Sequence, residues 1–204
     1  MIVFGASGHG KVIIEILESN GCTDIEVWDD AAKPDILHHR VQLASVDKLP
    51  ADAGMVIAVG SNKIRKMIAE RYSDKVAYIP AVHARTNLSP RCKVGAGTVV
   101  MAGVTINADA VIGAHCIINT NASVDHDCYI GDFVHISPNA SLCGTISVGE
   151  GTHIGAGATI IPNLKIGKWC TIGAGSVVIK DVPDYCTVVG NPGRIIKQNI
   201  TVSP

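Results

Sequence analysis

The sequence predicts a chain of two parts, a small parallel α/β domain over residues 1–80 and an all-β parallel β-helix over residues 81–204. Two patterns lead to this expectation. One aliphatic residue returns every six positions from Val82 onward, and strand-like runs alternate with helical runs before residue 80. Composition is the third observation: 47% of the residues are hydrophobic but only 4% are aromatic, so the core must consist mainly of small and branched aliphatic side chains.

Composition and charge narrow the class of protein. Of 204 residues, 17 are Lys or Arg and 18 are Asp or Glu, a formal net charge of −1. The apolar fraction excludes a disordered chain, and the lack of a Lys- or Arg-rich block argues against nucleic-acid binding. No run reaches the roughly 18 apolar residues of a membrane span, and residues 1–4 enter a strand-like run without a basic leader. We therefore expect a cytoplasmic protein with no nucleic-acid partner and no membrane span.

The six-residue repeat continues without a slip over sixteen positions. Each repeating position is Val, Leu or Ile: Val82, Leu88, Val94, Val100, Ile106, Ile112, Ile118, Val124, Ile130, Ile136, Leu142, Val148, Ile154, Ile160, Ile166 and Ile172. The fifth place of each hexad is mostly small, and the second is often Gly, which suits a sharp bend. A period of six fits a parallel β-helix with a short strand and a corner in each hexad. Three hexads make one coil, so residues 18 apart should stack about 4.8 Å apart, the strand spacing of a sheet.

Seven cysteines are accounted for largely by the same repeat. None forms a C-x-x-C pair, and the odd count leaves one over, so neither a metal site nor a disulfide framework is indicated. Four of them, Cys92, Cys116, Cys128 and Cys170, occupy the fifth place of a hexad. We interpret these four as compact apolar fillers of the core.

Residues 1–80 predict a Rossmann-like parallel sheet. The expected strands are 2–4, 25–28 and 55–59, with helices over 11–18 and from about 62 to 71. Ligands of such sheets bind at the carboxyl ends of the strands, which here carry Gly8-His9-Gly10, Asp29-Asp30 and Gly60-Ser61. The glycine turn can offer N–H groups to a phosphate, and Asp29 or Asp30 could accept hydrogen bonds from a ribose or a base. The spacing G-x-x-G-x-G is not the dinucleotide pattern, so NAD is not expected.

The uninterrupted hexads, with the closing segment Val189-Gly190-Asn191-Pro192-Gly193-Arg194, resemble the hexapeptide-repeat acyltransferases. This resemblance covers Val82 to Lys197 and implies a left-handed β-helix, although the usual crossover rule would favour the right hand. With Gly5-Ala6-Ser7-Gly8-His9-Gly10 ahead of the repeat, nearly the whole chain is similar to one subfamily. It is the group of bacterial sugar O- and N-acetyltransferases that includes the sialic acid and the bacillosamine-pathway UDP-4-amino-sugar enzymes.

The resemblance implies an acetyl-CoA-dependent acetyltransferase that forms a homotrimer with its sites between adjacent subunits. The residues that would hold the UDP part of a nucleotide sugar are Ser7, Gly8, His9, Asp29, Asp30 and Gly60. Asn119 would lie near the acceptor amine, His135 would contact acetyl-CoA, and backbone groups of Ala156 and Ala174 would contact the pantetheine arm. His153, which is 18 residues after His135, should stack on the same face and is expected to be exposed to solvent.

His126 is the candidate general base. It lies between Asp125 and Asp127, and the 18-residue rule places Ala108 below it and Gly144 above it, both too small to cover the ring. Moving an acetyl group from a thioester to an amine needs a proton acceptor near neutral pH and donors for the oxyanion. The Gly144 N–H is our candidate donor. The resemblance makes Asp127 the acid that orients the imidazole, but the matched enzyme has Glu there, so Asp125 stays the alternative.

We favour N-acetylation of the amine of a nucleotide-linked sugar, in particular a UDP-4-amino-4,6-dideoxy sugar. The alternatives are a sialic-acid-type O-acetyltransferase, a GDP-4-amino-sugar N-acetyltransferase and a non-catalytic scaffold that binds sugar nucleotides. A zinc enzyme of the γ-carbonic anhydrase type also has a β-helix, but it needs three converging histidines. No two histidines of the repeat are five residues apart, and Gly151 stands two coils after His115. We therefore expect no metal.

Overall fold

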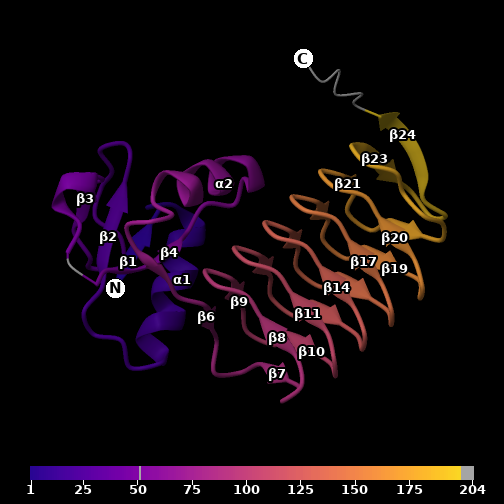
Figure 1. The fold of residues 1–204 in the computed structure, drawn as a ribbon, viewed down its shortest axis with the longest axis horizontal. Helices are drawn as coiled ribbons and strands as arrows, with labels where there is room; N and C mark the ends of the chain where they lie inside the picture. The colour runs from indigo at the N-terminus through magenta and orange to yellow at the C-terminus, as the bar shows by residue number, and fades with distance from the viewer. Residues whose placement is uncertain (51, 199–204) are drawn as a thin grey trace.

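The computed structural model describes residues 1–50 and 52–198, which form an α/β domain followed by a β-solenoid (Figure 1). The predicted fold class is confirmed. The last strand of the α/β sheet ends at Tyr78 and the first solenoid strand begins at Ala81. The C-terminal tail that the sequence suggests includes residues 199–204, which lie outside the described range.

The α/β domain has a five-stranded, all-parallel sheet in the order β3-β2-β1-β4-β5. Its elements are β1 (Ile2–Phe4), α1 (Gly8–Ser19), β2 (Glu26–Asp29), β3 (Val41–Leu43), a 3₁₀ turn (Val46–Lys48), β4 (Gly54–Ile57), α2 (Asn62–Arg71) and β5 (Ala77–Tyr78). The strand order reverses direction between β1 and β4, so the segments that follow these two strands flank the switch point of the sheet.

Two details of this domain differ from the sequence-based expectation. The first helix begins at Gly8 rather than at Lys11, so the glycine turn forms the first turn of α1. The edge strands β3 and β5 were not predicted, and they are only three and two residues long. Strands this short carry too little alternation to stand out in a sequence.

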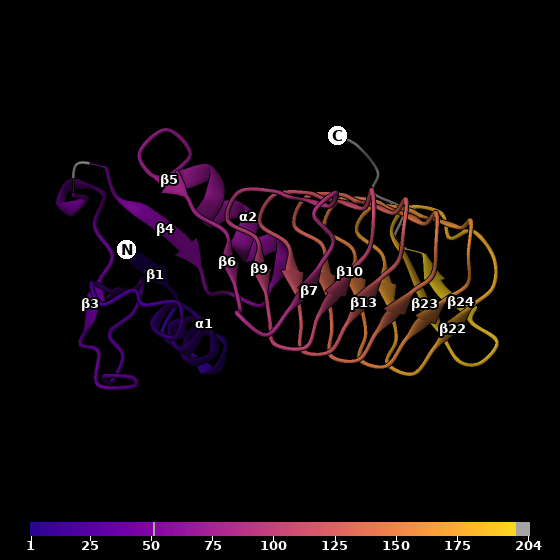
Figure 2. The same cartoon turned by 90° about the horizontal axis from the view of Figure 1, so that it is seen from below.

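The solenoid consists of strands arranged in three sheets, and all of its described strands except the last two have two residues (Figure 2). Sheet I contains β6 (Ala81–Val82), β9 (Val99–Val100), β12 (Ile117–Ile118), β15 (His135–Ile136), β18 (His153–Ile154), β21 (Thr171–Ile172), β23 (Cys186–Val189) and β24 (Arg194–Gln198). Sheet II contains β7 (Asn87–Leu88), β10 (Thr105–Ile106), β13 (Ser123–Val124), β16 (Ser141–Leu142), β19 (Thr159–Ile160) and β22 (Val177–Val178). Sheet III contains β8 (Lys93–Val94), β11 (Val111–Ile112), β14 (Tyr129–Ile130), β17 (Ser147–Val148) and β20 (Lys165–Ile166).

The strand register confirms the 18-residue coil. Ile106 pairs with Val124, and Val124 pairs with Leu142, with the second residue of each strand pointing into the core. The register changes only at the end, where Thr171 pairs with Thr187 because the last coil is shorter. We call the turns between the sheets the I–II corner (residues 119–122 and their stacked equivalents), the II–III corner (125–128 and equivalents) and the III–I corner (113–116 and equivalents).

Small residues allow the coils to stack closely at these corners. A Cβ on Gly95 would lie 2.5 Å from the backbone carbon and oxygen of Gly113 in the next coil. The cysteines behave as predicted: Cys116, Cys128 and Cys170 are buried in the core, Cys92 packs against it, and all seven are free thiols.

The α/β domain docks on the first coils through both of its helices (Figure 2). Ile13 and Ile14 of α1 share a hydrophobic cluster with Val99 and Ile117 of sheet I. At the III–I corner, a Tyr78–His115–Phe133 aromatic group lies beside α2, with the His115 and Phe133 rings stacked 5.1 Å apart. This docking sets the switch point of the α/β sheet against sheet I.

Candidate active site

The imidazole of His126 stands at the II–III corner, between β13 and β14. Its Nδ1 lies 2.7 Å from Oδ2 of Asp127, which favours the tautomer with the proton on Nδ1 and leaves Nε2 as an acceptor. The hydrogen bond to Asp127, followed by the charge of Asp125, raises the pKa of His126 above its ordinary value. The side chain is 56% exposed, so Nε2 is accessible to a reacting group.

Asp125 has a different task from Asp127. Its Oδ1 accepts hydrogen bonds from the His126 backbone N–H at 2.8 Å and from Asn107 Nδ2 at 2.7 Å. The Asn107 hydrogen bond, and then the backbone one, lower the pKa of Asp125. Of the two acids that the sequence left open, Asp127 is therefore the one bonded to the ring, and Asp125 holds the backbone of the corner.

Gly144 lies directly above His126, as the 18-residue rule predicts. The Thr145 N–H donates to the His126 carbonyl at 2.9 Å, and the Asp127 N–H donates to the Ala108 carbonyl at 3.1 Å. A Cβ on Gly144 would lie 2.6 Å from His126 Nε2, so only glycine leaves the ring in this position. Within residues 1–50 and 52–198, the Gly144 N–H has no hydrogen-bond partner, which leaves this donor available to a ligand beside the base.

The glycine segments of the α/β domain meet at the switch point. Ser7 is the N-cap residue of α1 and is exposed, with its hydroxyl making no capping bond, and Gly8 and His9 form the first turn of the helix. Gly60 follows β4 on the other side of the crevice. Burial first, and then the charge of Arg65, lower the pKa of His9 to about 4, so its ring is neutral at pH 7.

Asp29 and Asp30 are both engaged by protein groups. The two carboxylate oxygens of Asp29 accept hydrogen bonds from the Ala6 N–H at 2.9 Å and the Ala31 N–H at 3.0 Å. Asp30 forms an ion pair with Arg71 Nη1 at 2.7 Å on the exposed surface. Asp29 thus fixes the loop after β1 at the carboxyl end of β2. A ligand at this place would contact backbone groups and the exposed parts of the Asp29 and Asp30 carboxylates.

A histidine pair lies on sheet I. The rings of His135 and His153 stack with centroids 4.7 Å apart and planes inclined by 8°. Asn119 Nδ2 is 3.2 Å from His135 Nε2, and Ser137 Oγ is 2.8 Å from His153 Nε2. Burial, with the neighbouring His153 second, lowers the pKa of His135 to about 3, and burial lowers that of His153. His153 is exposed as expected, but its ring is fixed by the stack and by Ser137.

The switch point and this histidine pair are neighbours. Gly60 and His9 lie close enough to His135 to influence its pKa. A cavity of ≈ 290 Å³ continues from Gly60 along the start of α2 to His153 and Trp169. The structure therefore brings Gly60, His9, Asn119 and His135 to one region of the chain.

Ala156 and Ala174 stack at the I–II corner, where the Gly175 N–H donates to the Ala156 carbonyl at 2.8 Å. Asn119 belongs to the same corner, in earlier coils. His126, Asp127 and Gly144 belong to the II–III corner instead, at the opposite edge of sheet II. The predicted site residues thus form two groups in one chain rather than one.

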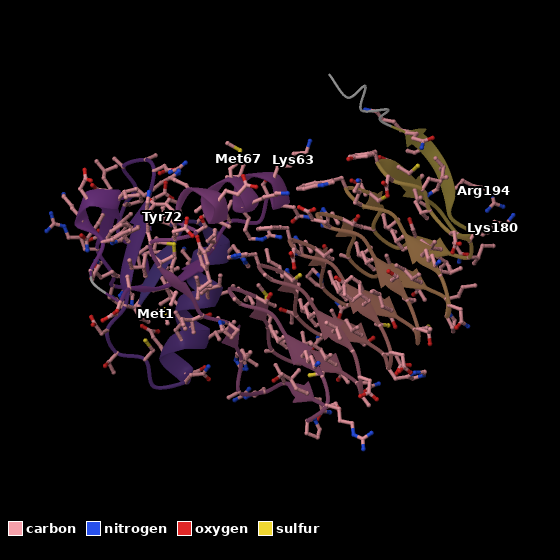
Figure 3. All side chains as sticks on the ribbon, in the orientation of Figure 1. Met1, Lys63, Met67, Tyr72, Lys180 and Arg194 are labelled. Atoms are coloured by element: carbon pink, nitrogen blue, oxygen red, sulfur yellow. The ribbon has the colours of Figure 1, made fainter. Side chains whose placement is uncertain are left out.

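The sequence-based search missed Arg65, a buried residue at the junction of the two parts. It lies in α2 and donates to backbone carbonyls of both the α/β domain and the solenoid. It is a charged residue close to Lys63 and Lys66 in the sequence, so the residue type indicates a surface position, which Lys63 does occupy (Figure 3). Only the docking of α2 on the III–I corner shows that it is buried.

The described part of the chain contains no group of three His, Cys, Asp or Glu side chains arranged to hold a metal ion. In the same residues, no helix is long and apolar enough to cross a membrane.

Comparisons with known proteins agree with the two-part architecture. A family model described as "PglD N-terminal domain" matches residues 1–72, and one described as "Bacterial transferase hexapeptide (six repeats)" matches residues 109–144 and 145–180. Among curated proteins, UDP-N-acetylbacillosamine N-acetyltransferase of Bacillus subtilis is 44% identical over 108 residues. That match spans 49% of this chain and 50% of the relative, so the chain spans about half the length of the curated relative it matches.

Two solved structures are similar over nearly their whole length. One is a variant of perosamine N-acetyltransferase from Caulobacter crescentus in complex with CoA and GDP-perosamine, with 35% identity, a TM-score of 0.91 and coverage of 97% of this chain and 96% of that chain. The other is the acetyltransferase domain of PglB from Neisseria gonorrhoeae in complex with acetyl coenzyme A. It has 36% identity, a TM-score of 0.91 and coverage of 96% and 98%.

Proposed function

This chain belongs to the PglD family of hexapeptide-repeat acetyltransferases, and from that membership we propose that it transfers the acetyl group of acetyl-CoA to the amine of a nucleotide-linked amino sugar. The observation that carries the proposal is the His126–Asp127 pair with Gly144 above it. This arrangement supplies a base of raised pKa, a free Nε2 and an adjacent unpaired N–H donor. The related perosamine and PglB structures, with bound CoA, GDP-perosamine or acetyl coenzyme A, support the choice of substrates.

In the proposed reaction, His126 Nε2 accepts a proton from the sugar amine as the nitrogen attacks the thioester carbonyl. The Gly144 N–H donates to the oxyanion that forms on the carbonyl oxygen. Collapse of this tetrahedral species breaks the carbon–sulfur bond, and the protonated His126 returns the proton to the departing CoA sulfur. Asp127 accepts the Nδ1–H throughout, which stabilises the transient imidazolium.

The predicted site residues that lie away from the II–III corner are assigned to substrate binding. We propose that Ser7, Gly8, His9 and Gly60 hold the diphosphate at the switch point, because the N-terminus of α1 directs N–H groups there and, among residues 1–50 and 52–198, the Ser7 side chain caps none of them. Asp29 and Asp30 would contact the ribose or base through the groups that their protein partners leave exposed. Residues assigned to the acceptor amine and to acetyl-CoA are Asn119, His135, Ala156 and Ala174.

A homotrimer would join the two groups. His126 stands at the II–III corner, whereas Asn119, Ala156 and Ala174 lie at the I–II corner and His135 lies on sheet I, so a ring of three chains can place the II–III corner of one chain against the I–II corner of the next. Each active site would then draw its base from one subunit and its substrate-binding residues from the neighbour.

For the sugar itself we propose a UDP-4-amino-4,6-dideoxy sugar. The identity to the Bacillus subtilis enzyme supports this choice, whereas the perosamine enzyme supports the GDP-linked alternative. Purified protein should release free thiol from acetyl-CoA when given one of these amino sugars. Turnover of the GDP-linked sugar alone would show that the substrate carries GDP rather than UDP. Activity on sialic acid alone would identify the protein as an O-acetyltransferase.

The variant His126→Ala tests the base. Loss of a general base should lower kcat by about 10²–10⁴-fold, while calorimetric binding of the nucleotide sugar stays unchanged because His126 lies away from the switch point. Equal activity of the variant and the wild type would refute the assignment. A wild type that binds nucleotide sugars but never releases thiol would instead identify a non-catalytic scaffold.

A further inference from the structure

Arg65 is a buried cation at the junction of the two parts. Its side chain is 1% exposed, and all five of its N–H groups are used. Nε donates to the His115 carbonyl at 2.7 Å, and Nη1 donates to the Val59 carbonyl at 2.9 Å and the Gly60 carbonyl at 3.3 Å. Nη2 donates to Asn62 Oδ1 and the Phe133 carbonyl, both at 2.9 Å. The hydrogen bonds therefore connect the end of β4 to two successive coils.

No carboxylate neutralises this guanidinium. Among the ion pairs of residues 1–50 and 52–198, none includes Arg65, whereas Lys66 and Arg71 of the same helix are paired with Glu150 and Asp30. Burial lowers the pKa of Arg65 only to about 10, so it stays charged at pH 7. A buried charge without a partner of opposite sign is uncommon, since desolvation makes it costly.

The titratable groups around Arg65 are mostly neutral histidines. Burial, followed by the charge of Arg65, lowers the pKa of His9 and of His115 to about 4, and Arg65 also contributes to the lowered pKa values of His135 and His153. Asp132 acts in the opposite direction on His115 and raises its pKa. Its Oδ1 accepts the Ala114 N–H. Arg65 is therefore the charged group that acts on all four of these histidines.

We propose that Arg65 is a positioning residue whose unneutralised charge also serves as the fixed counter-charge for the diphosphate of the substrate. Its hydrogen bonds to Val59 and Gly60 hold the β4 end of the crevice over sheet I, and its charge lies just behind the Gly60 backbone. The inference rests on the proposed function, because it needs a diphosphate at the switch point. It adds a source of affinity that the exposed site residues do not supply.

The test compares a charged ligand with a neutral one. Binding of UDP and of uridine, and of GDP and guanosine, is measured by calorimetry for the wild type, Arg65→Lys, Arg65→Gln and Arg65→Met. In both neutral variants, the ratio of the affinity for the diphosphate to the affinity for the nucleoside should fall roughly tenfold. This is the effect of one charge at several ångströms in a partly buried site. Arg65→Lys should keep that preference although it melts at a lower temperature, because it retains the charge but not the five hydrogen bonds. Two neutral variants are used so that the comparison can still be made if one of them does not fold.

Lys66→Met is the matched control. It removes a cation from the neighbouring position of α2, but that cation is already paired with Glu150, so the preference should stay at the wild-type value. If the role of Arg65 were only structural, its replacement would weaken the binding of diphosphate and of nucleoside equally. An unchanged affinity ratio in the neutral variants would therefore overturn this inference but not the proposed function. A wild type that binds neither UDP nor GDP would overturn the proposed function together with it.

Discussion

The pKa values of two histidines of the site are shifted in opposite directions by their surroundings. His126 is exposed and hydrogen-bonded to Asp127, which raises its pKa. His135 is half-buried and stacked on His153, and desolvation, followed by the charges of His153 and Arg65, lowers its pKa to about 3. A raised pKa suits a group that accepts a proton in the reaction. A lowered pKa keeps His135 neutral, so that it can accept the Asn119 amide hydrogen bond at Nε2 at physiological pH.

The pH profile of Asp127→Asn should reveal this tuning. His126 must be neutral to accept a proton, so activity rises with pH as the imidazolium loses its proton. Without the carboxylate the pKa of His126 falls, and the acidic limb of kcat/KM should move to lower pH. The plateau should also drop by at least roughly tenfold, because the ring loses its orientation. Steady-state rates between pH 5 and pH 9 would measure both effects.

Asp125→Asn is the control for this prediction. Its amide oxygen can still accept the backbone N–H of His126, and the Asp127 bond, which is the largest cause of the raised pKa, remains. The acidic limb should therefore move less than in Asp127→Asn. A larger shift in Asp125→Asn would show that Asp125, not Asp127, tunes the base.

Within the solenoid, Gly95 at the III–I corner and Gly144 at the II–III corner have different functions. Gly95 lets one coil approach the backbone of the next, while Gly144 makes room for the His126 ring. Gly95→Ala should destabilise the protein by about 1–3 kcal/mol, since the neighbouring backbone cannot move aside easily, and should leave the kcat of the folded enzyme unchanged. Gly144→Ala should change the melting temperature little, because an exposed ring can rotate away, but lower kcat by roughly a hundredfold.

Thermal melts and kcat values for the two alanine variants provide the measurement. The opposite result, a large loss of stability in Gly144→Ala with normal kcat, would mean that the space above His126 serves coil stacking rather than catalysis.

The sequence predicts the solenoid more completely than the α/β domain, and the reasons are physical. The repeat predicted the solenoid strands from β6 to β21 and the stack of Ala108, His126 and Gly144, because stacking at 18 residues is set by local chain geometry. In the α/β domain the short edge strands were missed. The hydrogen bond from the Ala6 N–H to Asp29 and the burial of Arg65 depend on contacts between segments far apart in the chain. A single sequence does not record such contacts.

The whole molecule separates the proposed base, at the II–III corner, from the proposed acetyl-CoA contact His135, on sheet I. If a neighbouring chain completes each site, His126→Ala and His135→Ala, each nearly inactive alone, should complement one another when co-expressed. In randomly mixed trimers about one site in four would combine an intact base with an intact partner group, giving roughly a quarter of the wild-type activity. Purification by two different tags, followed by the thiol-release assay, would measure it.

Mixing the same two variants after separate purification, under conditions that prevent subunit exchange, is the control and should give no recovery. If co-expressed mixtures also stay inactive while forming mixed oligomers, each site would be built from a single chain.

Asp127 has a backbone φ of 57°, the left-handed conformation that glycine adopts most readily. Aspartate tolerates it better than most residues, yet at some conformational cost. Replacing Asp127 with glycine would relieve that cost, but it would also remove the acceptor of the His126 Nδ1–H on which the proposed mechanism depends. In that mechanism, the acid at this position exchanges some backbone strain for a correctly oriented imidazole.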